Sequence, residues 1–291
     1  MNKTQIITAI SIITFLFFSC RKESFISSPD ARLSLSADSI KFDTVFTTVS
    51  SITQSFKIFN DNDQKLLLSK VKLMGGNGSA YKININGLAA NEADNIELAA
   101  NDSMYVFVTV NINPSAANLP FIISDSILIN YNGNNRFVQL QSYGQNAHFL
   151  NNTMITVNTV WPNDLPYVIL GGIQIDTTIS LTINAGCRIY SHANAPFIVD
   201  GTLIINGTKG NEVQFASDRL DEPYKNFPGG WPGIYFRGNS KDNEMTFAVI
   251  KNAYQALVLD GPSINANPKL QMHQCIIDNA YDAGILSFNS S

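Results

Sequence analysis

The chain carries little charge for its length, and its positive charge is not concentrated anywhere. Asp, Glu, Lys and Arg make up 14% of the 291 residues, against about a quarter in an ordinary soluble domain. The formal net charge is −4, and no basic run is present. Nucleic-acid-binding proteins carry a basic patch or stripe, so we expect no nucleic-acid partner.

Metal-binding motifs are lacking as well. The chain has three histidines, His148, His192 and His273, and their scattered positions do not match the ligand spacing of a zinc site. The run from Asn60 to Asp63 is rich in oxygen ligands but lacks the Gly and the distal Glu of an EF-hand loop, so a turn is expected there. We expect no cofactor, and Ca²⁺ stays open without a motif to support it.

A short repeat near the C-terminus indicates the architecture. Asn252-Ala253-Tyr254 returns 27 residues later as Asn279-Ala280-Tyr281, and apolar positions on both sides align too. Each copy has a β-branched run, an Asn turn and a second apolar run, with no helical period between them. A period of about 20 to 50 residues is typical of stacked repeats. We therefore predict coils of a parallel β-helix, with Asn252 and Asn279 stacked at one corner as a hydrogen-bonded ladder.

The expected β-helix occupies residues 165–291. Runs of three to five apolar and β-branched residues recur there, separated by glycines that suit tight corners. Cys187 and Cys275 fall about three coils apart, farther than the ~7 Å that a disulfide permits, so both are expected to be free, buried thiols. The chain stops at Ser291 partway through a coil, which predicts that this sequence is a fragment of a longer β-helix.

A different pattern precedes it. Residues 31–148 contain longer strand-like runs separated by turn residues, typical of an antiparallel sandwich. Asn132-Gly133 between two apolar runs predicts a tight hairpin. Residues 149–164, which include Trp161-Pro162, are interpreted as a joint. The predicted fold class is thus all-β, with an antiparallel sandwich followed by an incomplete parallel β-helix.

The N-terminus indicates export and a lipid anchor. Lys3 precedes an uncharged apolar run, Ile6 to Phe18, that is too short to span a bilayer. The run ends in Ser19-Cys20, which resembles a bacterial lipobox, with Phe17 and Phe18 departing from the commonest pattern. The resemblance implies that residues 1–20 form the signal region, with Cys20 lipidated as the mature N-terminus. Residues 21–30 would be a tether, and the absence of Asp after Cys20 favours the outer membrane, facing the surface or the periplasm.

Two segments resemble known families. The sandwich, through Phe56-Lys57-Ile58-Phe59-Asn60 and similar loose motifs, resembles immunoglobulin-like, major-sperm-protein-like modules of bacterial surface lipoproteins. The segment Leu181 to Cys187, the segment Gly201 to Thr208, and Val213 to Asp218 followed by Gly230 to Ile234 resemble coils of right-handed β-helix proteins of the pectate-lyase-like superfamily. That resemblance implies a scaffold used by polysaccharide lyases and hydrolases. No catalytic residue can be carried over by position.

The stretch with most candidate chemistry is the loop from Ala216 to Gly230. Asp218, Asp221, Glu222 and Tyr224 precede Trp231 at its end. Aromatic rings stack on pyranose faces and carboxylates accept hydroxyl hydrogen bonds, so these residues are candidate ligand-binding side chains. The alternatives are a Trp231 that only covers the edge of the helix above a solvated loop, and a carboxylate pair acting on a glycosidic bond.

The leading functional hypothesis is a non-catalytic lipoprotein of the cell envelope. Its β-helix would bind a glycan or a surface protein, and its sandwich would act as a spacer. A polysaccharide lyase or hydrolase on the same scaffold is the first alternative, and a purely structural envelope protein is the second. Fold alone does not decide among them, because one scaffold hosts several functions.

Overall fold

The structure, a computed structural model, describes residues 24–46, 51–113 and 121–289. In this part of the chain nearly all regular structure is β-strand, and the helical elements are two short 3-10 turns, η1 (Gly76–Gly78) and η2 (Tyr224–Asn226). No helix among the described residues has the length and apolarity needed to cross a membrane. The predicted all-β class is confirmed. Cys20 lies outside the described residues.

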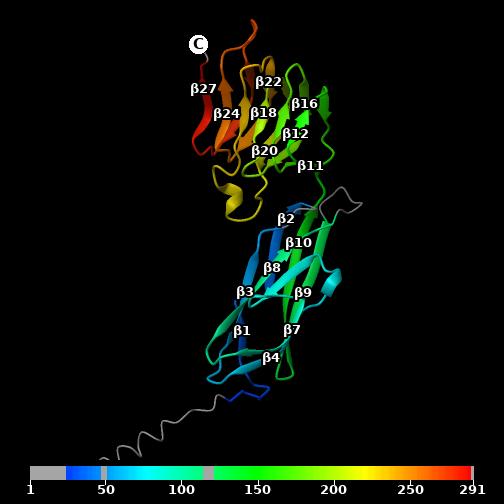
Figure 1. The fold of residues 1–291 in the computed structure, drawn as a ribbon, viewed down its shortest axis with the longest axis vertical. Helices are drawn as coiled ribbons and strands as arrows, with labels where there is room; N and C mark the ends of the chain where they lie inside the picture. Colours follow the sequence, from blue (N-terminus) through cyan, green and yellow to red (C-terminus); the bar gives the residue numbers. More distant parts are fainter. Residues whose placement is uncertain (1–23, 47–50, 114–120, 290–291) are drawn as a thin grey trace, which may run out of the picture. The chain divides into compact units, whose positions relative to one another are not determined.

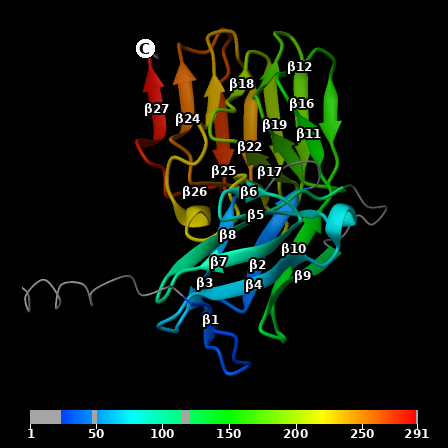
Figure 2. The same ribbon diagram turned by 60° about the horizontal axis from the view of Figure 1, so that its bottom comes forward.

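Two five-stranded antiparallel sheets form the N-terminal sandwich, in the orders β1-β3-β8-β5-β6 and β2-β10-β9-β4-β7 (Figures 1 and 2). The strands of the first sheet are β1 (Leu33–Leu35), β3 (Gln54–Asn60), β5 (Tyr81–Ile85), β6 (Leu88–Ala89) and β8 (Ser103–Val110). Those of the second are β2 (Ser39–Phe46), β4 (Leu66–Leu73), β7 (Glu92–Leu98), β9 (Phe121–Tyr131) and β10 (Asn134–Gln145).

The sandwich strands follow the alternation expected of sheets with one buried face. In β8, Met104, Val106 and Val108 are buried while Tyr105 and Phe107 are exposed, since successive side chains point to opposite faces. Strands β9 and β10 are adjacent and joined through Asn132 and Gly133, both with positive φ. Positive φ at both central positions characterises a type I′ hairpin turn, so the predicted hairpin is confirmed.

Three all-parallel sheets form the C-terminal β-helix (Figures 1 and 2). The first contains β11 (His148–Leu150), β14 (Tyr167–Ile169), β17 (Arg188–Ser191), β20 (Val213–Ser217), β23 (Ala248–Lys251) and β26 (Ile276–Asp278). The second contains β12 (Thr153–Ile155), β15 (Ile173–Ile175), β18 (Phe197–Val199), β21 (Ile234–Phe236), β24 (Gln255–Asp260) and β27 (Ala283–Phe288). The third contains β13 (Thr159–Trp161), β16 (Ser180–Asn184), β19 (Thr202–Asn206), β22 (Asn243–Thr246) and β25 (Leu270–His273). Each coil therefore takes one strand from each sheet in turn.

Parallel pairing begins earlier than the boundary expected at residue 165. β11, β12 and β13 pair with β14, β15 and β16, so a coil occupies much of the segment 149–164 that was interpreted as a joint. Trp161 belongs to the core of this coil, and its ring stacks on Tyr167 at 4.2 Å between centroids. The pair Trp161-Pro162 was the reason for predicting a linker, whereas the Trp161 side chain packs in the β-helix core.

Inward apolar side chains from every coil form one continuous core. In register, Leu181 lies over Leu203 and Ile183 over Ile205, so like residues stack from rung to rung. Cys187 is fully buried in this core, and burial raises the pKa of its thiol. Cys275 is half-buried, three strands further along the same sheet, and both thiols are free as expected.

Candidate functional site

The site is built at the corner where each coil passes from the first sheet to the second. Parallel register aligns Ser191 with Ser217, and continuing it through β23 and β26 brings Asn252 and Asn279 into the same column. Asn279 donates from Nδ2 to Oδ1 of Asn252 at 2.7 Å, so the predicted asparagine ladder is confirmed. Both asparagines have positive φ, 58° and 57°, a conformation that asparagine tolerates better than most residues.

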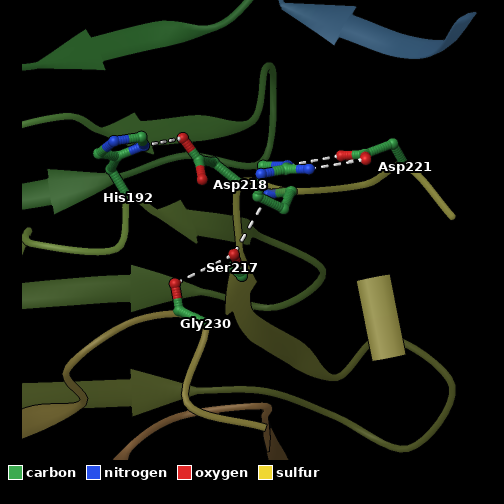
Figure 3. A network of polar contacts seen from close by, with 6 residues as sticks. His192, Ser217, Asp218, Asp221 and Gly230 are labelled. Carbon is green, nitrogen blue, oxygen red and sulfur yellow. Dashed lines mark hydrogen bonds and ion pairs between the residues drawn. The ribbon is translucent and has the colours of Figure 1, made fainter. Parts of the chain in front are cut away.

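In the coil of β20 and β21, a long loop leaves the corner at this column. Loop 218–230, the residues between Ser217 and Trp231, is closed at its neck by Ser217 (Figure 3). The Ser217 hydroxyl donates to the carbonyl of Gly230 at 3.2 Å and accepts from the backbone N–H of Arg219 at 3.2 Å. The Gly230 N–H donates to the carbonyl of Asn252 at 2.8 Å. The two ends of the loop are thereby fixed to each other, and the Gly230 end is fixed to the next coil.

Trp231 is a core residue in this structure. It is 1% exposed, stacks on Phe215 at 6.4 Å between centroids, and donates from Nε1 to the carbonyl of Lys251 at 2.8 Å. It also forms a parallel bridge with Ala253, so it occupies the corner position that Ala253 fills in the next coil. Its ring has no exposed face on which a sugar could stack. Trp231 is therefore not a candidate ligand-binding side chain in the folded protein, because its ring packs in the core.

Asp218 opens the loop as a buried carboxylate paired with an exposed histidine (Figure 3). Its Oδ2 lies 2.7 Å from Nδ1 of His192, while its side chain is only 10% exposed. Burial raises the pKa of Asp218, and the hydrogen bond from His192 opposes that shift. Within the described residues, Asp218 Oδ1 and the buried hydroxyl of Ser191 have no hydrogen-bond partner. His192 was not among the candidates from sequence, because the strand register is what brings it beside Asp218.

Further along the loop, charged and aromatic side chains form ion pairs and a cation–π contact with one another. Arg219 donates to Asp221 through Nε at 2.7 Å and through a terminal nitrogen at 2.9 Å, and this pairing lowers the pKa of Asp221. The Arg219 guanidinium also lies 4.0 Å from the centroid of the Tyr224 ring. Glu222 pairs with Lys225 at 2.5 Å. Asp221 is thus occupied by Arg219, whereas Glu222 and Tyr224 are exposed to solvent.

The asparagine ladder also reaches the loop. Asn252 donates from Nδ2 to the carbonyl of Lys225 at 2.7 Å, and Asn279 donates to the carbonyl of Asn226 at 2.8 Å. Both carbonyls belong to η2 at the outer part of the loop. Two successive coils therefore hold two successive loop residues.

Two tyrosines beside the loop form a ring stack that was not proposed from sequence as a site. Tyr254 and Tyr281 stack at 5.4 Å between centroids with an interplanar angle of 21°, and are 45% and 66% exposed. A Cβ placed on Gly229 would lie 3.4 Å from Cβ of Tyr281, so the loop runs directly against the stack. Tyr224 and Phe227 of the loop are exposed as well. The signal was present in the repeated Asn-Ala-Tyr, whose tyrosines recur at the spacing of one coil.

Metal ligands are not assembled at this corner. Across the described part of the chain, no three His, Cys, Asp or Glu side chains are grouped as a metal ion would need. The Asn60 turn uses its polar groups internally, since Nδ2 of Asn60 donates to the carbonyls of Gln64 and Ala99 at 2.8 and 2.7 Å. The turn predicted at residues 60–63 is therefore held by the protein's own carbonyls.

Comparisons with known proteins give only weak structural likenesses. No family model and no curated protein matches the chain. Among solved structures, a protein of unknown function from Porphyromonas gingivalis W83 is 12% identical with a TM-score of 0.29, covering 44% of this chain and 50% of that one. A family 123 glycoside hydrolase from Clostridium perfringens is 11% identical with a TM-score of 0.29, covering 45% and 30%. A PapD-like domain of human CEP192 is 10% identical with a TM-score of 0.27, covering 42% and 89%. The chain thus spans half or less of the first two proteins, and likenesses this weak carry no functional argument.

Proposed function

We propose that this protein is a lipid-anchored envelope protein whose β-helix binds glycans without cleaving them. The observation that carries the proposal is the exposed Tyr254–Tyr281 stack beside the fastened loop 218–230. Flat aromatic faces pack against the C–H faces of pyranose rings, and rings already held by mutual stacking lose less conformational freedom when a sugar binds. We call Tyr224, Phe227, Tyr254 and Tyr281 the aromatic surface.

Polar groups next to the aromatic surface supply hydrogen bonds for sugar hydroxyls. Glu222 and the Tyr224 hydroxyl lie on the loop, and Asp282, which accepts from Gln255 Nε2 at 2.8 Å, follows Tyr281 directly. Asp218 and Asp221 face His192 and Arg219, so we assign them to holding the loop. Of the candidate set from sequence, Glu222 and Tyr224 are the members proposed to contact the glycan.

Native affinity electrophoresis of the soluble portion from Pro29 tests the proposal, in gels containing acidic or neutral polysaccharides. We expect retardation by at least one polymer, weakened about tenfold by Tyr281→Ala or Tyr254→Ala, which corresponds to about 1.4 kcal/mol. Tyr105→Ala is the matched control, because Tyr105 is an exposed, stacked tyrosine of the sandwich. Equal loss in the control, or no retardation by any polymer, contradicts glycan binding at this surface.

The anchor is a separate part of the proposal. Cys20 would carry the lipid, the outer membrane would be its location, and the sandwich would act as a spacer. More than one acyl chain is needed for stable anchoring. Cys20→Ala should move the protein from the membrane fraction to the soluble fraction, and unchanged retention would refute lipidation at this residue.

One observation favours an enzyme as the second candidate. His192 binds the buried Asp218 through Nδ1, and this arrangement orients Nε2 for proton transfer. A polysaccharide lyase or hydrolase would use such a base. Cleavage of a polymer during the electrophoresis, abolished by His192→Ala, would establish this activity, whereas intact polymer with retardation supports the non-catalytic protein. Neither retardation nor cleavage would favour the structural role.

A further inference from the structure

We infer that Asn252 and Asn279 are positioning residues, whose side-chain amides hold loop 218–230 against the tyrosine stack. The inference rests on the proposed glycan-binding function for its ligand, while the positioning itself rests on the hydrogen bonds of the ladder. The two asparagines touch the loop and each other, and these three hydrogen bonds join protein atoms without any ligand.

Each asparagine does two things at once. Its positive φ turns the chain at the corner, which places Tyr254 or Tyr281 two residues later on the same outer surface. Its Nδ2 donates to a loop carbonyl, that of Lys225 for Asn252 and that of Asn226 for Asn279. One residue type therefore fixes a tyrosine of the stack through the backbone and a loop residue through the side chain.

The ladder is connected end to end. Oδ1 of Asn252 accepts from Nδ2 of Asn279, so the acceptor left over by one asparagine satisfies the second amide hydrogen of the other. In preceding coils the same column carries Ser191 and Ser217, whose short hydroxyls stay at the corner or the loop neck. Asparagine occurs in this column only in the two coils that follow the loop among the described residues. A side-chain amide can donate to a carbonyl outside the corner while its oxygen accepts within the column, as Asn252 does with Lys225 and Asn279.

Substitution to glycine distinguishes the positioning role of the side chain from the role of the residue in turning the backbone. Glycine adopts positive φ without strain, so Asn252→Gly and Asn279→Gly keep the turn but remove the donor. Asn279→Asp keeps the shape and replaces the donor by an acceptor facing the Asn226 carbonyl. Asn152→Gly is the matched control, since Asn152 has φ 48° in the first coil and its amide donates to Asn151, away from the loop.

Limited trypsin digestion of the full chain measures the positioning without any glycan. The carbonyl held by Asn252 belongs to Lys225, so it is the carbonyl that trypsin attacks when it cleaves after Lys225. We expect Asn252→Gly to speed this cleavage about tenfold, with cleavage after the exposed Lys209 unchanged. Asn152→Gly should leave both rates as in the wild type. Unchanged cleavage at Lys225, or equal acceleration at Lys209, overturns the inference.

Affinity electrophoresis then tests whether the positioning of the loop by the asparagines is needed for glycan binding. Asn279→Gly and Asn279→Asp should both weaken glycan retardation about fivefold, although neither removes an aromatic ring. Full retardation in both variants would overturn the link between the ladder and the ligand. A wild type that binds no polysaccharide, yet has Lys225 protected in the ladder-dependent way, would overturn the proposed function and support the positioning.

Discussion

Arg237 donates from Nε to Oδ1 of Asp200 at 2.6 Å and contacts Oδ2 through a terminal nitrogen, which joins the ends of two neighbouring β-helix strands. Gln174, one coil earlier, donates to Oδ2 of the same carboxylate at 2.6 Å. β15, β18 and β21 are neighbours in the second sheet, so three coils meet at one side chain. Asp200 is buried while Arg237 is half exposed.

The Asp200 pairing predicts a pH dependence of stability. The hydrogen bond from Arg237 lowers the pKa of Asp200 below its usual range, so the stabilisation is present above the unfolded-state pKa of about 3.9 and is lost as pH falls through the lower folded-state value. Asp200→Asn should reduce the free energy of unfolding at pH 7 by about 1.5–3 kcal/mol. The unfolding free energy, measured in urea between pH 7 and pH 2, should fall less steeply with decreasing pH in this variant than in the wild type. The exposed Asp30→Asn serves as control. An equally steep fall in Asp200→Asn and in the wild type would contradict the assignment.

Gly233 lies where two coils approach too closely for a side chain. It has φ +117°, and a Cβ there would meet the carbonyl oxygen of Gln255 at 1.7 Å. Gly233→Ala should therefore lower the free energy of unfolding by more than about 2 kcal/mol, because both the backbone conformation and the neighbouring coil oppose it. Gly238→Ala, with no atom within 4 Å, should change it by less than about 0.5 kcal/mol. Similar unfolding midpoints for the two variants in urea would refute this explanation.

Lys269 is a buried cation enclosed by backbone oxygens. Its Nζ donates to the carbonyls of Asp260 at 2.6 Å and Arg237 at 3.0 Å, and burial lowers its pKa. Lys269→Met retains the aliphatic volume but removes the donor from these partly buried carbonyls, so we expect a loss of about 1–3 kcal/mol in unfolding free energy. Lys209→Met, at an exposed lysine, should have little effect. Thermal denaturation followed by circular dichroism measures the difference, and equal stability of the two variants would show that the carbonyls do not need the ammonium.

Trp231 should behave as a core residue when it is replaced. Trp231→Ala leaves a large cavity beside Phe215 and should cost about 3–5 kcal/mol of unfolding free energy, with a smaller cost for Trp231→Phe. Trp231→Phe, measured under conditions in which it stays folded, should keep its retardation by polysaccharide, because the ring does not face solvent. Selective loss of binding in a folded Trp231→Phe protein would restore Trp231 as a ligand contact.

The local sequence pattern was enough to predict the architecture. The 27-residue return of Asn-Ala-Tyr indicated stacked coils, and the ladder between Asn252 and Asn279 has the predicted partners. Asn132-Gly133 indicated a hairpin for a similar reason, since a two-residue turn with positive φ constrains its neighbours by itself. These features depend on side-chain period and backbone preference, which a short stretch of chain already carries.

The site depended on neighbours far apart in sequence. His192 reaches Asp218 across 26 residues, and Asn279 reaches the carbonyl of Asn226 across 53. Trp231 looked like a sugar-stacking residue because it ends a polar loop, yet coil register puts it in the interior and leaves Tyr254 and Tyr281 outside. The residue pattern was sufficient to predict coils from residue 165 onward and the corner that Asn252 and Asn279 share. The folded chain was needed to show which side chains share a corner and which ring faces solvent, because both depend on the register between coils.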